Sequence, residues 1–132
     1  MWPERTTIPG DDGMPKIHRR YLFGTGKTFG VFLHHFVAGD APTEFHDHPW
    51  SWGLSLVLRG GYLEERRRRE ERATTRRWLG PGRFNLILPG MFHRVELRDS
   101  RPAWTLFVHG PKVRRWGFLD STTGAFRFWS PR

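Results

Sequence analysis

The chain has 132 residues, which is enough for one domain with a single hydrophobic core. It contains no cysteine, so disulfides and thiolate metal sites are excluded, and a transition metal would have to be held by imidazole and carboxylate groups. The net charge of +9 comes mainly from arginine and is compatible either with a nucleic-acid partner or with solvated charged faces.

The sequence shows neither the apolar run of a membrane-spanning helix nor the pattern of an export signal. No apolar run approaches the roughly 20 residues of a membrane-spanning helix, and Met1 to Arg5 lack the basic-then-apolar order of a secretory signal. We therefore expect a cytoplasmic protein. Residues 1–20 are rich in proline, glycine and charge without a period, and they are expected to form an N-terminal arm before a domain over residues 21–132.

Short apolar runs separated by Gly/Pro turns make up the rest of the chain, and no long 3.6-residue apolar period occurs. Gly24-Thr25-Gly26-Lys27 lacks the spacing of a phosphate-binding loop and is expected to be a turn. The expected strands lie at 29–37, 46–48, 54–58, 62–68, 73–79, 84–88, 93–97 and 104–108, followed by an aromatic tail. The strand 84–88 is expected to be buried. This series predicts an all-β sandwich or barrel.

Three histidines carry the strongest chemical signal. His46 and His48 lie two residues apart in one expected strand, so alternation would point both imidazoles to the same side. His93 follows a second apolar run and a Pro-Gly turn. Neutral imidazole is the usual nitrogen ligand of Fe, Zn, Ni and Cu. The pair alone reads more readily as two surface histidines, and the third imidazole is what favours a metal site.

The order of these residues resembles the motifs of the cupin family. The first motif is matched by Gly39, His46, His48 and Gly60, and the second by Gly82, Gly90 and His93, with Pro89 one place nearer the glycine than the motif has it. The match covers roughly residues 39–97 and is similar to small cupins of bacteria and their phages. It implies a single-domain cupin β-barrel (a jelly roll, or double-stranded β-helix) with a metal at His46, His48 and His93.

The sequence departs from the family pattern at the metal-binding glutamate, which should fall near Trp52 or Gly53. Three explanations stay open: a three-histidine face with open positions, replacement by another carboxylate, or a degenerate site. The candidate replacements are Asp47, Glu64 and Glu65, although Asp47 should point away from the two histidines on a strand. The 2-oxoglutarate oxygenases place an acid where His48 stands, so that subclass is disfavoured.

Four further residues are candidates for supporting the metal or for acid–base chemistry: His34, His35, His109 and Tyr62. The alternative for each is simple core packing. Alternation puts His34 and His35 on opposite faces of their strand, so one of them should face the interior. An arginine in the pocket would suit a carboxylate or phosphate substrate, and those nearest the motifs are Arg59, Arg83 and Arg94.

The arginine-rich segment 66–77 contains interleaved glutamates. We interpret it as a charged hairpin that blocks edge-to-edge aggregation, and we do not expect nucleic-acid binding.

The cupin resemblance implies a metal-dependent enzyme that acts on a small metabolite, with a dioxygenase or oxidoreductase using a three-histidine Fe(II) site as the preferred form. A lyase, isomerase or hydrolase using Zn, Ni or Mn is the first alternative, because the sequence does not fix the metal. A non-catalytic ligand-binding or structural cupin is the second, and the missing glutamate favours it. By analogy with the family, we expect a homodimer.

Overall fold

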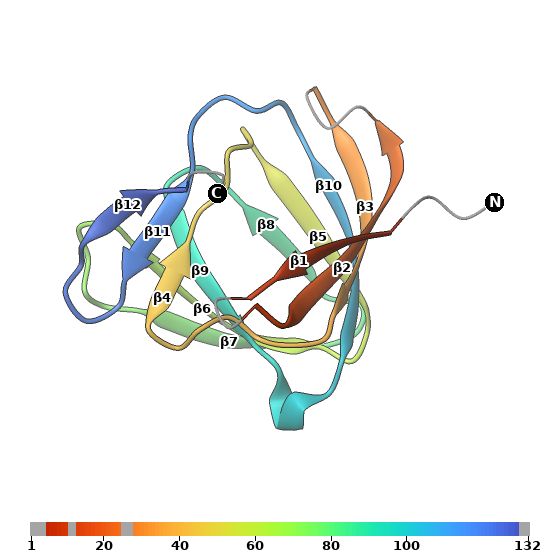
Figure 1. Ribbon diagram of the computed structural model, residues 1–132, viewed down its shortest axis with the longest axis horizontal. Helices are drawn as coiled ribbons and strands as arrows, with labels where there is room; N and C mark the ends of the chain where they lie inside the picture. The colour runs from red at the N-terminus through yellow and green to blue at the C-terminus, as the bar shows by residue number, and fades with distance from the viewer. Residues whose placement is uncertain (1–4, 11–12, 25–27, 130–132) are drawn as a thin grey trace.

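The structure is a computed structural model that describes residues 5–10, 13–24 and 28–129. Within these ranges the chain forms twelve strands, and a single 3₁₀ turn at Arg98–Ser100 is the one helical element. The strands build two six-stranded antiparallel sheets that curve around a common interior (Figure 1). The predicted all-β fold is confirmed.

The first sheet has the order β1-β2-β3-β10-β5-β8 and the second the order β12-β11-β4-β9-β6-β7. The first contains β1 (Arg5–Pro9), β2 (Pro15–Gly24), β3 (Gly30–Phe36), β10 (Ala103–His109), β5 (Gly53–Arg59) and β8 (Phe84–Ile87). The second contains β12 (Phe126–Phe128), β11 (Gly117–Asp120), β4 (Glu44–His46), β9 (Met91–Glu96), β6 (Tyr62–Arg68) and β7 (Thr75–Leu79). Several neighbours in each sheet come from distant parts of the sequence, among them β4 and β9.

The N-terminal region adds two strands to the first sheet. β1 and β2 form an antiparallel hairpin, and β2 pairs with β3 in a register that places Arg19 opposite His34. The predicted boundary between arm and barrel, after residue 20, falls inside β2. Residues 25–27 of the turn predicted at 24–27 lie outside the described part of the chain.

Alternation decides which side chains of the first sheet face the interior. On β3, Phe32 and His34 are buried and His35 lies on the outer face, as the period of two predicts. The prediction of a buried strand at 84–88 was wrong for three of its five residues, Phe84, Leu86 and Leu88, which are exposed. Phe84 and Leu86 are 61% and 50% exposed, because β8 packs only one face on the core and these two side chains lie on the outer face of the sheet.

The core consists of three apolar clusters between the sheets. One contains Phe32, Trp50, Ile87 and Phe107, the second Val57, Tyr62, Leu79 and Val95, and the third Phe45, Phe92 and Leu119. In the described residues, we find no helix with the length and apolar character needed to cross a bilayer. The cytoplasmic location stays a prediction.

Candidate metal centre

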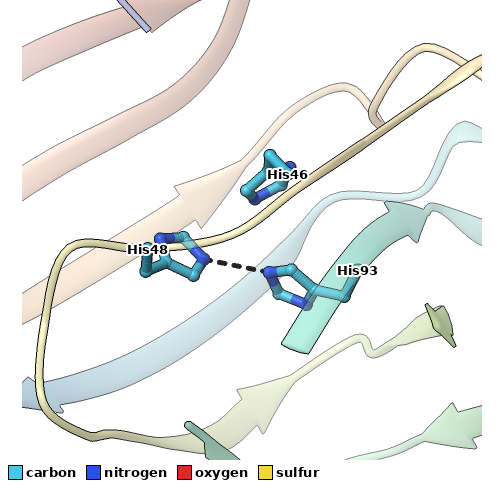
Figure 2. Close-up of side chains that lie close together, drawn as sticks. All are labelled: His46, His48 and His93. Atoms are coloured by element: carbon cyan, nitrogen blue, oxygen red, sulfur yellow. Dashed lines mark hydrogen bonds between the residues drawn. The ribbon is translucent and has the colours of Figure 1, made fainter. Parts of the chain in front are cut away.

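Three imidazoles lie together on the inner side of the second sheet. His46, His48 and His93 each offer a ring nitrogen, and these three atoms lie within 4.8 Å of one another. The Nε2 atoms of His48 and His93 are 3.0 Å apart, and Figure 2 shows the three rings turned toward a common point. The residues are separated by up to 47 positions in sequence, and the sheet brings them to one place.

The backbone around His46 sets the arrangement. His46 ends β4 and lies directly opposite His93 in the β4–β9 pairing. His48 lies beyond the end of β4, so the two histidines do not share one regular strand as predicted. Alternation nevertheless persists through Asp47, which points to the other side: its Oδ1 accepts a hydrogen bond from the Gly117 N–H at 2.7 Å. The two flanking imidazoles therefore share a side.

Burial favours the neutral form of His46 and of His48. The pKa of His46 is lowered well below its ordinary value, first by burial and then by His93 and Lys16. The pKa of His48 is lowered well below its ordinary value by burial, and then by His46, His93 and Arg19. The neutral ring has a free nitrogen lone pair and is the form that binds a metal.

The residues fit a divalent metal by their chemistry, and one pair of ring nitrogens fits it by its spacing. Nitrogen ligands bind such ions at about 2.0–2.1 Å, so two of them at a right angle lie about 3 Å apart. The 3.0 Å separation of the His48 and His93 Nε2 atoms matches that value. Imidazole suits Fe, Zn, Ni and Cu alike, so the donor set does not distinguish among these metals.

Glu64 supports the cluster from behind His93. Its Oε2 lies 2.9 Å from Nδ1 of His93, the nitrogen that faces away from His48. The carboxylate is fully buried and also binds Arg66 and the Asn85 amide. Burial works to raise the pKa of Glu64, but hydrogen bonds and charge interactions with His93 and Arg66 outweigh it and hold the pKa well below its usual value. A carboxylate in this position fixes the tautomer of a metal-binding histidine.

The three carboxylates considered as replacements for the family's glutamate are engaged elsewhere. Glu64 binds the far nitrogen of His93, Glu65 accepts a hydrogen bond from Arg94 at 2.8 Å, and Asp47 faces away. Among the described residues, the ligand group therefore contains only the three histidines. Sequence reasoning missed Asp40, which it assigned to a turn. The Asp40 Oδ2 atom lies 3.8 Å from the His46 Nδ1 atom.

A cavity of about 80 Å³ lies beside the imidazoles, between the two sheets. His34 and Tyr62 line this cavity, together with Trp50, Phe107 and Arg19. His34 is 6% exposed, and burial, followed by the charge of Arg19, lowers its pKa well below the usual value. The structure thus places two of the four additional candidates beside the three imidazoles.

The other two candidates do not reach the cavity. His35 lies on the outer face of the first sheet, where its ring stacks on Trp104 with 4.0 Å between centroids. His109 is fully buried, donates from Nδ1 to the Gly110 carbonyl at 2.8 Å and stacks on Trp50. The His109 ring also packs against Gly30: a Cβ at position 30 would lie 2.5 Å from the His109 Nε2 atom, so there is no room for a larger residue.

The arginine beside the cavity is not one of those nearest to the motifs. Arg94 pairs with Glu65, and Arg59 and Arg83 are exposed and do not line the cavity. Arg19 lines it instead, from β2, in the region that we expected to be a loose arm. Its only sequence signal is the alternation of Ile17, Arg19 and Tyr21, which the neighbouring charges obscure.

No protein-family model and no curated protein matches this sequence. Among solved structures, the chain resembles Streptomyces albus HEPD with 2-hydroxyethylphosphonate and Fe(II) bound (TM-score 0.64, 16% identity, covering 83% of this chain and 24% of that one). It also resembles hydroxypropylphosphonic acid epoxidase from S. wedmorenis (TM-score 0.61, 11% identity, 80% and 55%). The chain therefore spans about half of the epoxidase and a quarter of HEPD.

A third similar structure matches over nearly the whole of both chains. It is described as a sugar phosphate isomerase from a cupin superfamily, from Silicibacter pomeroyi, with a TM-score of 0.58 and 18% identity. The match covers 98% of this chain and 87% of that one. The order of the strands, the two facing sheets and this likeness lead to one conclusion: the chain has the cupin fold.

Proposed function

We propose that this protein is a metal-dependent enzyme that acts on a small metabolite, and that His46, His48 and His93 hold one divalent ion. The observation that carries the proposal is the convergence of three imidazoles beside a cavity. Fe(II) is the favoured metal, and the activity we propose first is that of a dioxygenase or oxidoreductase. The Fe(II)-bound HEPD structure supports this choice, because its fold is similar.

The bound ion would supply Lewis acidity and, as iron, redox chemistry with O2. The chain contributes the surroundings of that ion. Glu64 orients His93 through Nδ1, and Asp40 lies on the Nδ1 side of His46. Trp50 and Phe107 form apolar walls of the cavity, which limit the access of water to a substrate. Three neutral ligands leave the full charge of the ion and several open positions for substrate oxygens.

Isomerisation is the second candidate function, in which Zn, Ni or Mn would replace iron. It is supported by the match to the sugar phosphate isomerase, which is of similar length. In that case the ion would polarise a carbonyl group and an acid–base residue of the cavity would move the proton. Tyr62 is a candidate for this role, since it lines the cavity and its hydroxyl accepts a hydrogen bond from Asn85 at 3.2 Å.

The two functions are distinguished by oxygen consumption. The protein is loaded anaerobically with Fe(II), Zn, Ni or Mn and mixed with small hydroxylated acids and phosphorylated metabolites in aerated buffer. We expect uptake of O2 only with the iron form and only with an intact cluster, so His46→Ala serves as the control. No uptake with the iron form, together with conversion of a sugar phosphate by another metal form, would favour the isomerase. No turnover with any metal form would favour the non-catalytic alternative, in which the protein only binds a ligand.

A further inference from the structure

Two cations line the cavity, and they differ in how they are neutralised. Lys16 pairs with Asp40. Arg19 lies on the inner face of β2, and in the described part of the chain no carboxylate forms an ion pair with it. The guanidinium stays protonated at any physiological pH. Arg19 is therefore a positive charge, only partly exposed, that lacks an anionic partner within these residues.

Neutral groups hold Arg19 in place without cancelling its charge. Nε donates to His34 Nε2 at 2.9 Å, and Tyr21 contributes a further side-chain hydrogen bond. The guanidinium carbon lies 4.3 Å from the centre of the Phe32 ring, a cation–π contact. His34 accepts from Arg19 and is itself neutral because its pKa is lowered by burial and by the positive charge of Arg19. His34 takes the single N–H of Nε, so the Tyr21 hydrogen bond uses a terminal nitrogen. The remaining N–H groups of the terminal nitrogens are the part that can bind an oxyanion.

The cavity links this arginine to the imidazole cluster. One continuous space is lined by Arg19 and His34 from the first sheet and by His46 and His93 from the second sheet. His48, which follows β4, also lines it. A partly buried positive charge is costly unless an anion balances it. At about 80 Å³, the space suits a small molecule.

We propose that Arg19 binds the anionic group of a small oxyanion substrate, a phosphate, phosphonate or carboxylate, whose other end faces the three imidazoles. The orientation of the substrate toward the three imidazoles rests on the proposed function, whereas the binding of the anion depends on Arg19 alone. Arg19 is then the residue that selects charged over neutral substrates, because its planar fork matches two oxygens of one oxyanion.

The test is isothermal titration calorimetry of the full-length chain with inorganic phosphate, methylphosphonate and acetate as probes. Each titration is made on the protein freed of metal by a chelator and on His46→Ala, so that an anion cannot bind through a metal. We expect one saturable site per chain. Arg19→Gln should weaken it by about 10- to 100-fold, and Arg19→Lys, which keeps the charge but loses the fork, by less.

The matched control is Arg20→Gln. Arg20 is the next residue on β2, pairs with Leu33 on β3 and so alternates to the outer face, and its replacement removes the same net charge. It should leave the affinity unchanged. Circular dichroism melting of each variant confirms that the titrated protein is folded. The preferred probe assigns the substrate group as phosphate, phosphonate or carboxylate, and each of these three results supports the proposal.

Two results would overturn the proposal: no binding of any probe by the folded wild type, or equal weakening by Arg19→Gln and Arg20→Gln, which would mean that only the overall charge attracts anions. Both are independent of the proposed function. If the protein binds anions through Arg19 but binds no metal, the proposed enzyme function fails and the anion site stands. If the protein binds a metal but no anion, the anion site fails and the proposed function stands.

Discussion

The Nδ1 atom of His93 lies 2.9 Å from the Oε2 atom of Glu64, and the opposite nitrogen of the same ring lies 3.0 Å from His48. Glu64 pairs with Val95 on β9, and His93 is two residues from Val95, so Glu64 and His93 are diagonal neighbours on the inner face. A buried carboxylate therefore fixes which nitrogen of His93 faces the cluster.

The first prediction concerns this carboxylate. Glu64→Gln keeps an acceptor for His93 but removes the charge, so we expect metal affinity to fall by about 10- to 100-fold, as for other groups that orient metal ligands. Competition with a chromophoric chelator measures the change. Glu65→Gln is the matched control: Glu65 is the next residue, it is paired with Arg94, and its replacement should leave metal affinity unchanged. Equal losses in both variants would contradict the role of Glu64.

The second prediction concerns Asp47, which lies between two of the histidines but faces away from them. Its Oδ1 accepts from the Gly117 N–H, and its Oδ2 lies 3.1 Å from Arg114. Asp47→Ala should destabilise the protein by about 1–3 kcal/mol, because the buried N–H loses its partner. Asp47→Asn, which retains the acceptor, should cost less and should still bind metal. Urea unfolding measures the stability and metal titration measures the binding. If the folded Asp47→Asn variant no longer binds metal, Asp47 is itself a ligand, which contradicts this prediction.

The third prediction concerns pH and His34, whose pKa is lowered well below its ordinary value by burial, with Arg19 and His109 as neighbouring charges. The unfolded chain takes up a proton at this residue near pH 6.5, whereas the folded chain does so only at lower pH. The contribution of His34 to stability is thus complete above pH 6.5 and is lost as the pH falls toward the folded pKa, at up to about 1.4 kcal/mol per pH unit.

Urea unfolding of the metal-free protein between neutral and mildly acidic pH measures this slope. His34→Gln preserves an acceptor for Arg19 but cannot titrate, so it should flatten the dependence. The control is His18→Gln on the outer face of the same sheet, where His18 pairs with His35. An unchanged slope in His34→Gln would show that His34 is not neutral in the folded protein.

The fourth prediction concerns the expected homodimer, for which the outer face of the first sheet offers a surface. Leu54, Leu56, Leu58, Phe84, Leu86, Trp104, Leu106 and Val108 point outward from β5, β8 and β10. A solvated sheet face is ordinarily polar, whereas along those strands this one carries a single charge, Arg59 at the end of β5, so two identical copies can pack with little repulsion. We therefore expect a dimer through this face.

Light scattering after size-exclusion chromatography measures the mass. Leu86→Lys, at a position that is 50% exposed in the single chain, should convert the dimer to a monomer. Val113→Lys introduces the same charge at a residue that is 60% exposed in the segment between β10 and β11, and it should remain dimeric. A monomeric wild type, or dissociation by both variants, would rule out this interface.

The sequence predicted the cluster better than its surroundings. Strand alternation and motif spacing singled out His46, His48 and His93, because residue types that can bind a metal, and their local order, are visible in the sequence. They could not show that Glu64 lies behind His93, because that contact depends on the β6–β9 register. Arg19 was missed because charged residues in an apparent arm hide the period of two, and only pairing with β3 makes β2 part of the barrel wall.

The account depends on one ion held by three imidazoles, and a titration of the metal-free chain with Co(II), followed by its visible absorption, tests this most directly. We expect saturation at one equivalent per chain, loss of the signal in His48→Ala and in His93→Ala, and an unchanged titration in His35→Ala, whose ring lies on the outer face. A wild-type chain that shows no saturable absorption, or one whose titration survives the replacement of all three cluster histidines, would contradict the account.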